Sequence, residues 1–130
     1  MAKSKVLMTG ASGYIASLML PTMRDYFDLT LADISDTDRD GNKVEGVIAT
    51  DFIDPDRTKY QYLFEDIDAV IHLAFKPHTP RGAKFTSQPI DRFENEHENI
   101  QMANNIYRSA YDAGVRRLAV ASSNHAADWY

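Results

Sequence analysis

A glycine turn between a predicted strand and a predicted helix constrains the fold of this chain more than any other feature. Apolar residues 6–8 end at a turn that contains Gly10 and Gly13, and apolar residues then recur at helical spacing over residues 14–26. Gly10 permits a sharp change of chain direction, and Gly13 permits close approach of the backbone to a phosphate group. The predicted helix presents free N–H groups and a positive dipole end at its start. Two glycines in this place often form only a turn. The rest of the sequence therefore has to show whether this turn binds a phosphate group.

Strands and helices alternate along the remainder of the chain. This alternation predicts an α/β fold, a three-layer, Rossmann-type, doubly wound parallel sheet of five strands in the order 3-2-1-4-5, with residues 1–130 forming one domain. Pro21 is expected to kink the first helix. The last helix is expected to bury Ile100, Ala103, Ile106 and Ala110. The predicted strands are 6–8, 28–33, 46–50, 68–74 and 118–122, and the predicted helices are 14–26, a short helix from 54, and 91–113.

The overall charge and the absence of cysteine exclude several classes of function. The chain has 14 lysine and arginine residues against 19 aspartate and glutamate residues, which gives a formal charge of -5. An acidic chain of this kind is not expected to bind nucleic acid or an anionic membrane surface. Its apolar runs are too short to span a bilayer. Without cysteine, disulfides and thiolate metal sites are excluded, and we expect a cytoplasmic protein.

Acidic residues follow two of the predicted strands, at the edge where parallel sheets bind ligands. Asp33 lies 20 residues after Gly13 and is placed to accept hydrogen bonds from the ribose hydroxyls of a dinucleotide. Its charge would repel a 2′-phosphate, which favours NAD over NADP, and Arg39 lies too far along the chain to be an obvious phosphate ligand. Asp51 and Phe52 are predicted to pair with the adenine and to cover its ring. Each aspartate has an alternative role as the cap of the turn that follows it.

The sequence gives no pattern of metal ligands. The four histidines show no helical ligand spacing, so no metal is expected. Residues 36–41 match the first half of a calcium-binding loop, but Val47 occupies the position of its bidentate glutamate. We interpret this segment as a solvated acidic connection. His72 is predicted to be buried in the fourth strand, whereas His125, just after the fifth strand, is placed to touch a ligand.

Four motifs occur in an order that is similar to one protein family. The chain has TGASGYIA at the glycine turn, LADI after the second strand, IHLA in the fourth strand and a Ser-Ser pair after AGVRRLAVA, and Asn99 lies in the last predicted helix. Together they resemble the extended short-chain dehydrogenases, also called the NAD-dependent epimerase/dehydratase family. The closing SSNH and Pro21 resemble the uronate dehydrogenases within it, which oxidise hexuronic acids with NAD.

The resemblance implies a role for each matching residue. Ser123 corresponds to the catalytic serine that hydrogen-bonds the substrate oxygen, and Asn124 and His125 correspond to substrate contacts. Asn99 would order the cofactor site. The implied cofactor is NAD, with Gly10, Gly13, Tyr14 and Ile15 at the pyrophosphate, Asp33 and Ile34 at the ribose, Asp51 and Phe52 at the adenine, Leu73, Ala74 and Phe75 at the nicotinamide side, and Ser122 beside them.

The proton acceptor of that family is missing from these 130 residues. It is a tyrosine four residues before a lysine, whose ammonium group favours the ionised phenol. No tyrosine in this sequence has a lysine at that spacing. We therefore expect the catalytic part of the family to lie outside residues 1–130, and this segment to be inactive alone.

Three functions remain open from the sequence. The first is the NAD-binding portion of an oxidoreductase that acts on a small-molecule sugar or sugar acid. The second is the equivalent portion of a sugar-nucleotide epimerase or dehydratase, which shares these motifs. The third is a non-catalytic NAD-binding sensor module, for which a homo-oligomer that covers the edge of the fifth strand is expected.

Overall fold

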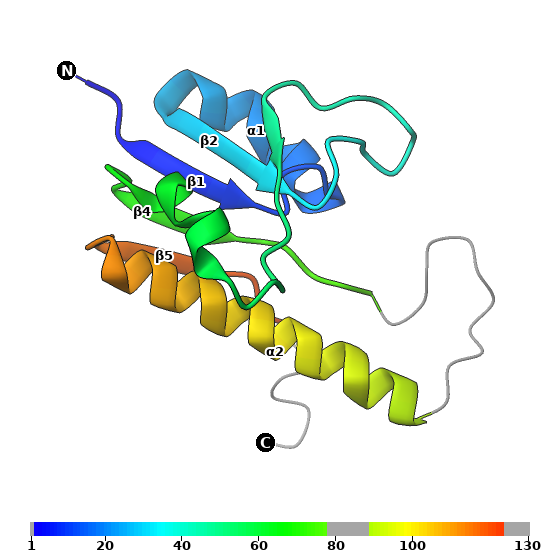
Figure 1. The fold of residues 1–130 in the computed structure, drawn as a ribbon. Helices are drawn as coiled ribbons and strands as arrows, with labels where there is room; N and C mark the ends of the chain where they lie inside the picture. Colours follow the sequence, from blue (N-terminus) through cyan, green and yellow to red (C-terminus); the bar gives the residue numbers. More distant parts are fainter. Residues whose placement is uncertain (1, 78–88, 124–130) are drawn as a thin grey trace.

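The computed structural model describes residues 2–77 and 89–123, and it contains one five-stranded parallel sheet (Figure 1). The strand order is β3-β2-β1-β4-β5, which confirms the predicted fold class and topology. The elements are β1 (Lys5–Thr9), α1 (Tyr14–Tyr26), β2 (Asp28–Asp33), β3 (Val47–Ala49), the short 3-10 helices η1 (Arg57–Lys59) and η2 (Gln61–Phe64), β4 (Ala69–His72), α2 (Pro89–Asp112) and β5 (Arg117–Val120).

Strand β1 is the centre of the sheet. Leu7 pairs with Thr30 of β2 on one side and with Val70 of β4 on the other. Residues 6–9 of β1 are buried, whereas all four residues of β5 are exposed at the sheet edge. Because all the strands are parallel, their carboxyl ends lie at the same edge of the sheet.

The side chains of β1 alternate between two hydrophobic clusters, one on each face of the sheet. On one face, Met8 packs with Ala16 and Leu20 of α1. On the other face, Leu7 packs in a larger cluster with residues of α2 and of the segment that contains η1 and η2. Figure 1 shows α2 and this segment on one side of the sheet and α1 on the other. Helix α1 continues unbroken through Pro21. The sheet is therefore covered on both faces around β1, as predicted, whereas β5 at the edge stays exposed.

The buried face of α2 differs from the predicted one. Ile100 is 66% exposed, so its predicted burial is wrong. Asn105 lies on the buried face instead, and its Nδ2 donates to the backbone oxygens of Phe52 at 2.9 Å and Asp54 at 3.2 Å. A buried amide in this role replaces an apolar contact, because the irregular segment after β3 has carbonyl groups that need donors. Among residues 92–112 of the helix, the buried ones are Met102, Asn105, Ile106, Ser109 and Ala110.

His72 connects two strands inside the sheet, and its predicted burial is confirmed. Thr9 Oγ1 and His72 Nδ1 lie 2.8 Å apart, at the carboxyl ends of β1 and β4. The imidazole ring also meets the ring of Tyr107 in α2 edge to face, with centroids 6.3 Å apart. Burial lowers the pKa of His72, because desolvation penalises the charged ring.

We expect the free energy of unfolding to fall as the pH drops below the unfolded-state pKa of histidine, about 6.5. The folded-state pKa of His72 is the lower of the two, so its contribution is complete above that pH and declines below it, by up to about 1.4 kcal/mol per pH unit. Urea denaturation near pH 7 and near pH 5.5 measures this slope for the wild type and for His72→Gln, which should lose most of it. His97→Gln, at an exposed position of α2, is the control and should keep the slope. An equal slope in the wild type and in His72→Gln would contradict the prediction.

Candidate functional site

Two adjoining pockets lie at the carboxyl ends of the strands. The first, here called the Asp33 pocket, has a volume of about 390 Å³ and opens between β2, the segment after β3, and α2. The second, here called the Ser123 pocket, has a volume of about 380 Å³ and lies between β4, β5 and α2. Both are lined by Ala74 and Phe75, which follow β4. One ligand with two ends could therefore occupy both pockets across this shared segment.

The glycine turn lies beside that shared segment. Gly10 has a φ of +72°, and a Cβ atom added to it would lie 2.5 Å from the backbone nitrogen of Ala74. The predicted sharp turn is therefore present, and it also allows β1 to approach the chain after β4. No other residue type fits at this position without displacing backbone.

Gly13 begins helix α1 and has no side chain to cap it. Its amide donates to the carbonyl of Gly10 at 3.0 Å, and its carbonyl accepts from Ser17. Helix α1, which the structure describes in full, has no acidic residue in its first turn. Tyr14 and Ile15 are about half exposed at its start. An uncapped helix start of this kind can receive an anion.

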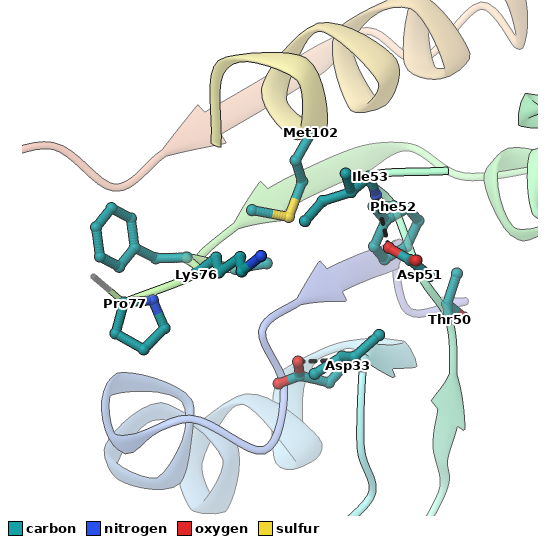
Figure 2. A pocket seen from close by; sticks show the side chains of 11 residues that line it. Asp33, Thr50, Asp51, Phe52, Ile53, Lys76, Pro77 and Met102 are labelled. Atoms are coloured by element: carbon teal, nitrogen blue, oxygen red, sulfur yellow. Dashed lines mark hydrogen bonds between the residues drawn. The ribbon is translucent and has the colours of Figure 1, made fainter. Parts of the chain in front are cut away.

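Asp33 is held in place by the glycine turn. Its Oδ2 accepts from the backbone nitrogen and the hydroxyl of Ser12, at 3.0 and 2.7 Å, and its Oδ1 accepts from the amide of Ile34 at 2.7 Å. The capping role considered for Asp33 is therefore present. Each carboxylate oxygen can accept more than one hydrogen bond, so Oδ1 keeps capacity for a ligand hydroxyl. Figure 2 shows Asp33 and Met102 on opposite sides of the Asp33 pocket.

The structure corrects the expectation for Phe52. Its side chain is 3% exposed and packs edge to face against Tyr60, with ring centroids 5.1 Å apart. A ring buried in this way does not cover an adenine. Asp51 accepts from the amide of Ile53 at 2.9 Å, which corresponds to its alternative role as a turn cap. Both residues line the Asp33 pocket, and Ile34 and Met102 supply apolar surface there.

Asn99 holds the segment that both pockets share. Its Oδ1 accepts from the amide of Lys76 at 2.7 Å, and its Nδ2 donates to the carbonyl of Lys76 at 2.9 Å. The neighbouring Glu98 forms an ion pair with the Lys76 ammonium group. Two consecutive residues of α2 therefore fix the backbone and the side chain of one residue after β4.

The Ser123 pocket contains most of the residues predicted for the reacting end of the site. It is lined by Leu73, Ala74, Phe75, Asn99, Ser122 and Ser123. Buried His72 and the ring of Tyr107 also line it. The predicted substrate contacts Asn124 and His125 lie outside the described residues.

Comparison with known proteins identifies the family. The model of the NAD dependent epimerase/dehydratase family matches residues 6–129. The chain belongs to this family. Within it, NAD is the cofactor, as the name of the family states.

Several relatives of this epimerase/dehydratase family member have been characterised. Uronate dehydrogenase of Pseudomonas putida is 29% identical over 128 residues, covering 98% of this chain and 43% of the relative. An NAD-dependent glucose-6-phosphate dehydrogenase of Haloferax volcanii is 30% identical, covering 96% of this chain and 45% of the relative. The crystal structure of uronate dehydrogenase from Agrobacterium tumefaciens has a TM-score of 0.72 at 27% identity, covering 100% of this chain and 44% of that one, and a variant of it has been solved with NAD. The chain spans less than half the length of these relatives.

The residues at the two pockets fit NAD. The uncapped start of α1 suits an anionic pyrophosphate, and the free capacity of Asp33 Oδ1 suits a ribose hydroxyl. The two pockets, joined at Ala74 and Phe75, suit a molecule with a ring system at each end. Among the described residues, no group of three histidine, aspartate or glutamate side chains could hold a metal ion. The described helices are also too short or too polar to cross a membrane.

Sequence reasoning placed Arg39 too far along the chain to be an obvious phosphate ligand, but the structure brings it back to the start of α1. Its guanidinium carbon lies 4.4 Å from the centroid of the Tyr14 ring, beside the glycine turn. The acidic loop folds back toward α1, because Asp38 accepts from Asn42 and the amide of Val44 donates to the carbonyl of Asp36. The spacing of residues along the chain cannot predict the contact between Arg39 and Tyr14, because this contact depends on how the loop folds back.

We expect Gly10→Ala to lower the free energy of unfolding far more than Gly41→Ala. Both glycines have a positive φ, which costs a residue with a Cβ about 1–2 kcal/mol. The space beside Gly41 is open, whereas the added methyl group at Gly10 meets the Ala74 backbone. Overpacking of this kind adds roughly 1–3 kcal/mol. Urea denaturation of the two variants measures the difference. Equal losses of unfolding free energy would show that the close approach of Gly10 to Ala74 does not affect stability.

Asn99→Ala should accelerate hydrogen exchange at the Lys76 amide by more than about tenfold, because the amide loses the acceptor that protects it. Exchange followed by NMR or mass spectrometry measures this effect. Asn104→Ala, at an exposed position of the same helix, is the matched control and should leave the rate unchanged. Unchanged exchange in Asn99→Ala would mean that the segment is held by other contacts.

Proposed function

We propose that this chain forms the NAD-binding portion of an oxidoreductase that oxidises a hexuronic acid. The observation that carries the proposal is the order of groups along the two pockets, from Asp33 in one to Ser123 in the other, with Gly10 of the glycine turn against the Ala74 backbone that both share. The similarity to uronate dehydrogenases over 98% of the chain supports this choice of substrate class.

Each end of the site has a separate task in this proposal. The start of α1 binds the pyrophosphate, and Asp33 accepts from a hydroxyl of the adenosine ribose. Asn99 positions the nicotinamide end through the Lys76 backbone, which it contacts with both of its polar atoms. Ala74 and Phe75 line the passage between the two ends.

Ser123 is the proposed catalytic residue in this chain. It lines the Ser123 pocket just beyond β5, where its hydroxyl would donate to the substrate oxygen that becomes a carbonyl. When bound, NAD accepts a hydride from the carbon that bears this oxygen. The hydroxyl proton needs a separate acceptor, which we propose is not among residues 1–130, because no tyrosine here precedes a lysine by four positions.

The proposal predicts that the complete gene product forms NADH from NAD with glucuronate or galacturonate. Ser123→Ala should lower kcat by roughly 100-fold, because a donor to the reacting oxygen is lost. Its affinity for NAD should change little. NADH absorbance measures the rate, and Ser4→Ala, at the opposite end of the sheet from the pockets, is the control.

Two results would contradict the proposed substrate. One is the absence of NADH with every hexuronate when glucose 6-phosphate is oxidised, because a sugar phosphate would then be the substrate. The other is turnover of a nucleotide sugar alone, which would place the protein with the epimerases and dehydratases of the family. If NAD binds and none of these compounds is turned over, the sensor function becomes the better account.

A further inference from the structure

The loop between β2 and β3 places a cation beside the start of α1. Arg39 lies at the tip of this loop, which is closed by the hydrogen bond from the amide of Asp38 to the carbonyl of Asn42, at 2.8 Å. The Arg39 guanidinium stacks over the ring of Tyr14, the first residue of α1. Stacking of a guanidinium on an aromatic ring is attractive even at an exposed site. It holds a flexible side chain near the glycine turn.

The contacts of Arg39 with the described residues leave its charge available. Its ion pair with Asp40 is long, at 3.9 Å, and its side chain is 51% exposed. Neighbouring cations are engaged elsewhere, since Lys43 pairs with Asp36 and Arg24 donates to the carbonyl of Glu45. Arg39 thus has a longer contact with its acceptor than Lys43 and Arg24 have with theirs.

The acidic surroundings of the site oppose the binding of a pyrophosphate, and a nearby cation would offset this repulsion. Asp33 and Asp51 line the Asp33 pocket, and the whole chain has a formal charge of -5. A pyrophosphate adds two negative charges to this acidic surface, and the partial charge at a helix start offsets only part of them. A planar guanidinium can stack on an aromatic ring and still donate in pairs to phosphate oxygens.

We propose that Arg39 binds the pyrophosphate of the dinucleotide, with Tyr14 holding its guanidinium over the glycine turn. This inference rests on the NAD binding assumed in the proposed function, and it adds a residue that lies outside the glycine motif. Arg39 contributes affinity for the phosphates and not for the adenosine.

Calorimetry with NAD, ADP and adenosine tests this assignment. Arg39→Ala should weaken NAD and ADP binding by roughly tenfold each, because a charge-assisted hydrogen bond is lost, and should leave adenosine binding unchanged. Arg39→Lys should lie between Arg39→Ala and the wild type, because it keeps the charge but loses the planar fork. Lys43→Ala removes a charge from the same loop and is the matched control, with unchanged affinity for all three ligands.

Two outcomes would overturn the inference. Unchanged NAD affinity in Arg39→Ala would show that the guanidinium does not reach the phosphates. Equal weakening of adenosine and ADP would assign Arg39 to the adenosine or to loop structure. If the wild-type protein binds neither NAD nor ADP, the proposed function itself fails along with the inference.

Discussion

The close approach of Gly10 to the backbone after β4 is the contact on which the rest of the site depends. A single carbon added to Gly10 would lie 2.5 Å from the backbone nitrogen of Ala74. The backbone after β1 and the backbone after β4 therefore meet without any side chain between them. Ala74 lines both pockets. The hydrogen bond between Thr9, which precedes Gly10, and His72, two residues before Ala74, joins the same two strands. The glycine therefore serves the packing of the protein, in addition to the part in dinucleotide binding that we propose for its turn. A wider separation here would displace Ala74, which lines both pockets.

The strands and the fold class could be predicted because they follow from local periodicity, and the strand order is the one that accompanies a glycine turn after the first strand and an acid after the second in folds of this class. Apolar runs that end at turns define the five strands, and Asp33 lies at the end of the second one, as its spacing from Gly13 indicated. These features depend on neighbouring residues in the chain. The two hydrophobic clusters follow from the same periodicity, since alternate residues of β1 face opposite sides of the sheet.

The errors and omissions involve contacts between distant residues. Ile100 looked buried by helical spacing, but the buried face of α2 includes Asn105, which satisfies carbonyls about 50 residues earlier in the chain. Phe52 looked available for an adenine, but the segment that contains η1 and η2 folds its aromatic rings around it. Arg39 looked remote because the loop that returns it to Tyr14 has no regular pattern. In each case the deciding partner lies too far along the chain for periodicity to reveal it.

Helix α2 links the two ends of the site mechanically. Met102 lines the Asp33 pocket and Tyr107 lines the Ser123 pocket. Asn99 is hydrogen-bonded to the backbone of the segment that both pockets share. All three belong to one rigid element that is packed on the sheet through Ile106 and Ala110. A shift of this helix would therefore change both pockets together. In the proposed function, a ligand that spans both pockets would contact surfaces set by the same helix, so its binding at the adenosine end and its orientation at the reacting end would be coupled through α2.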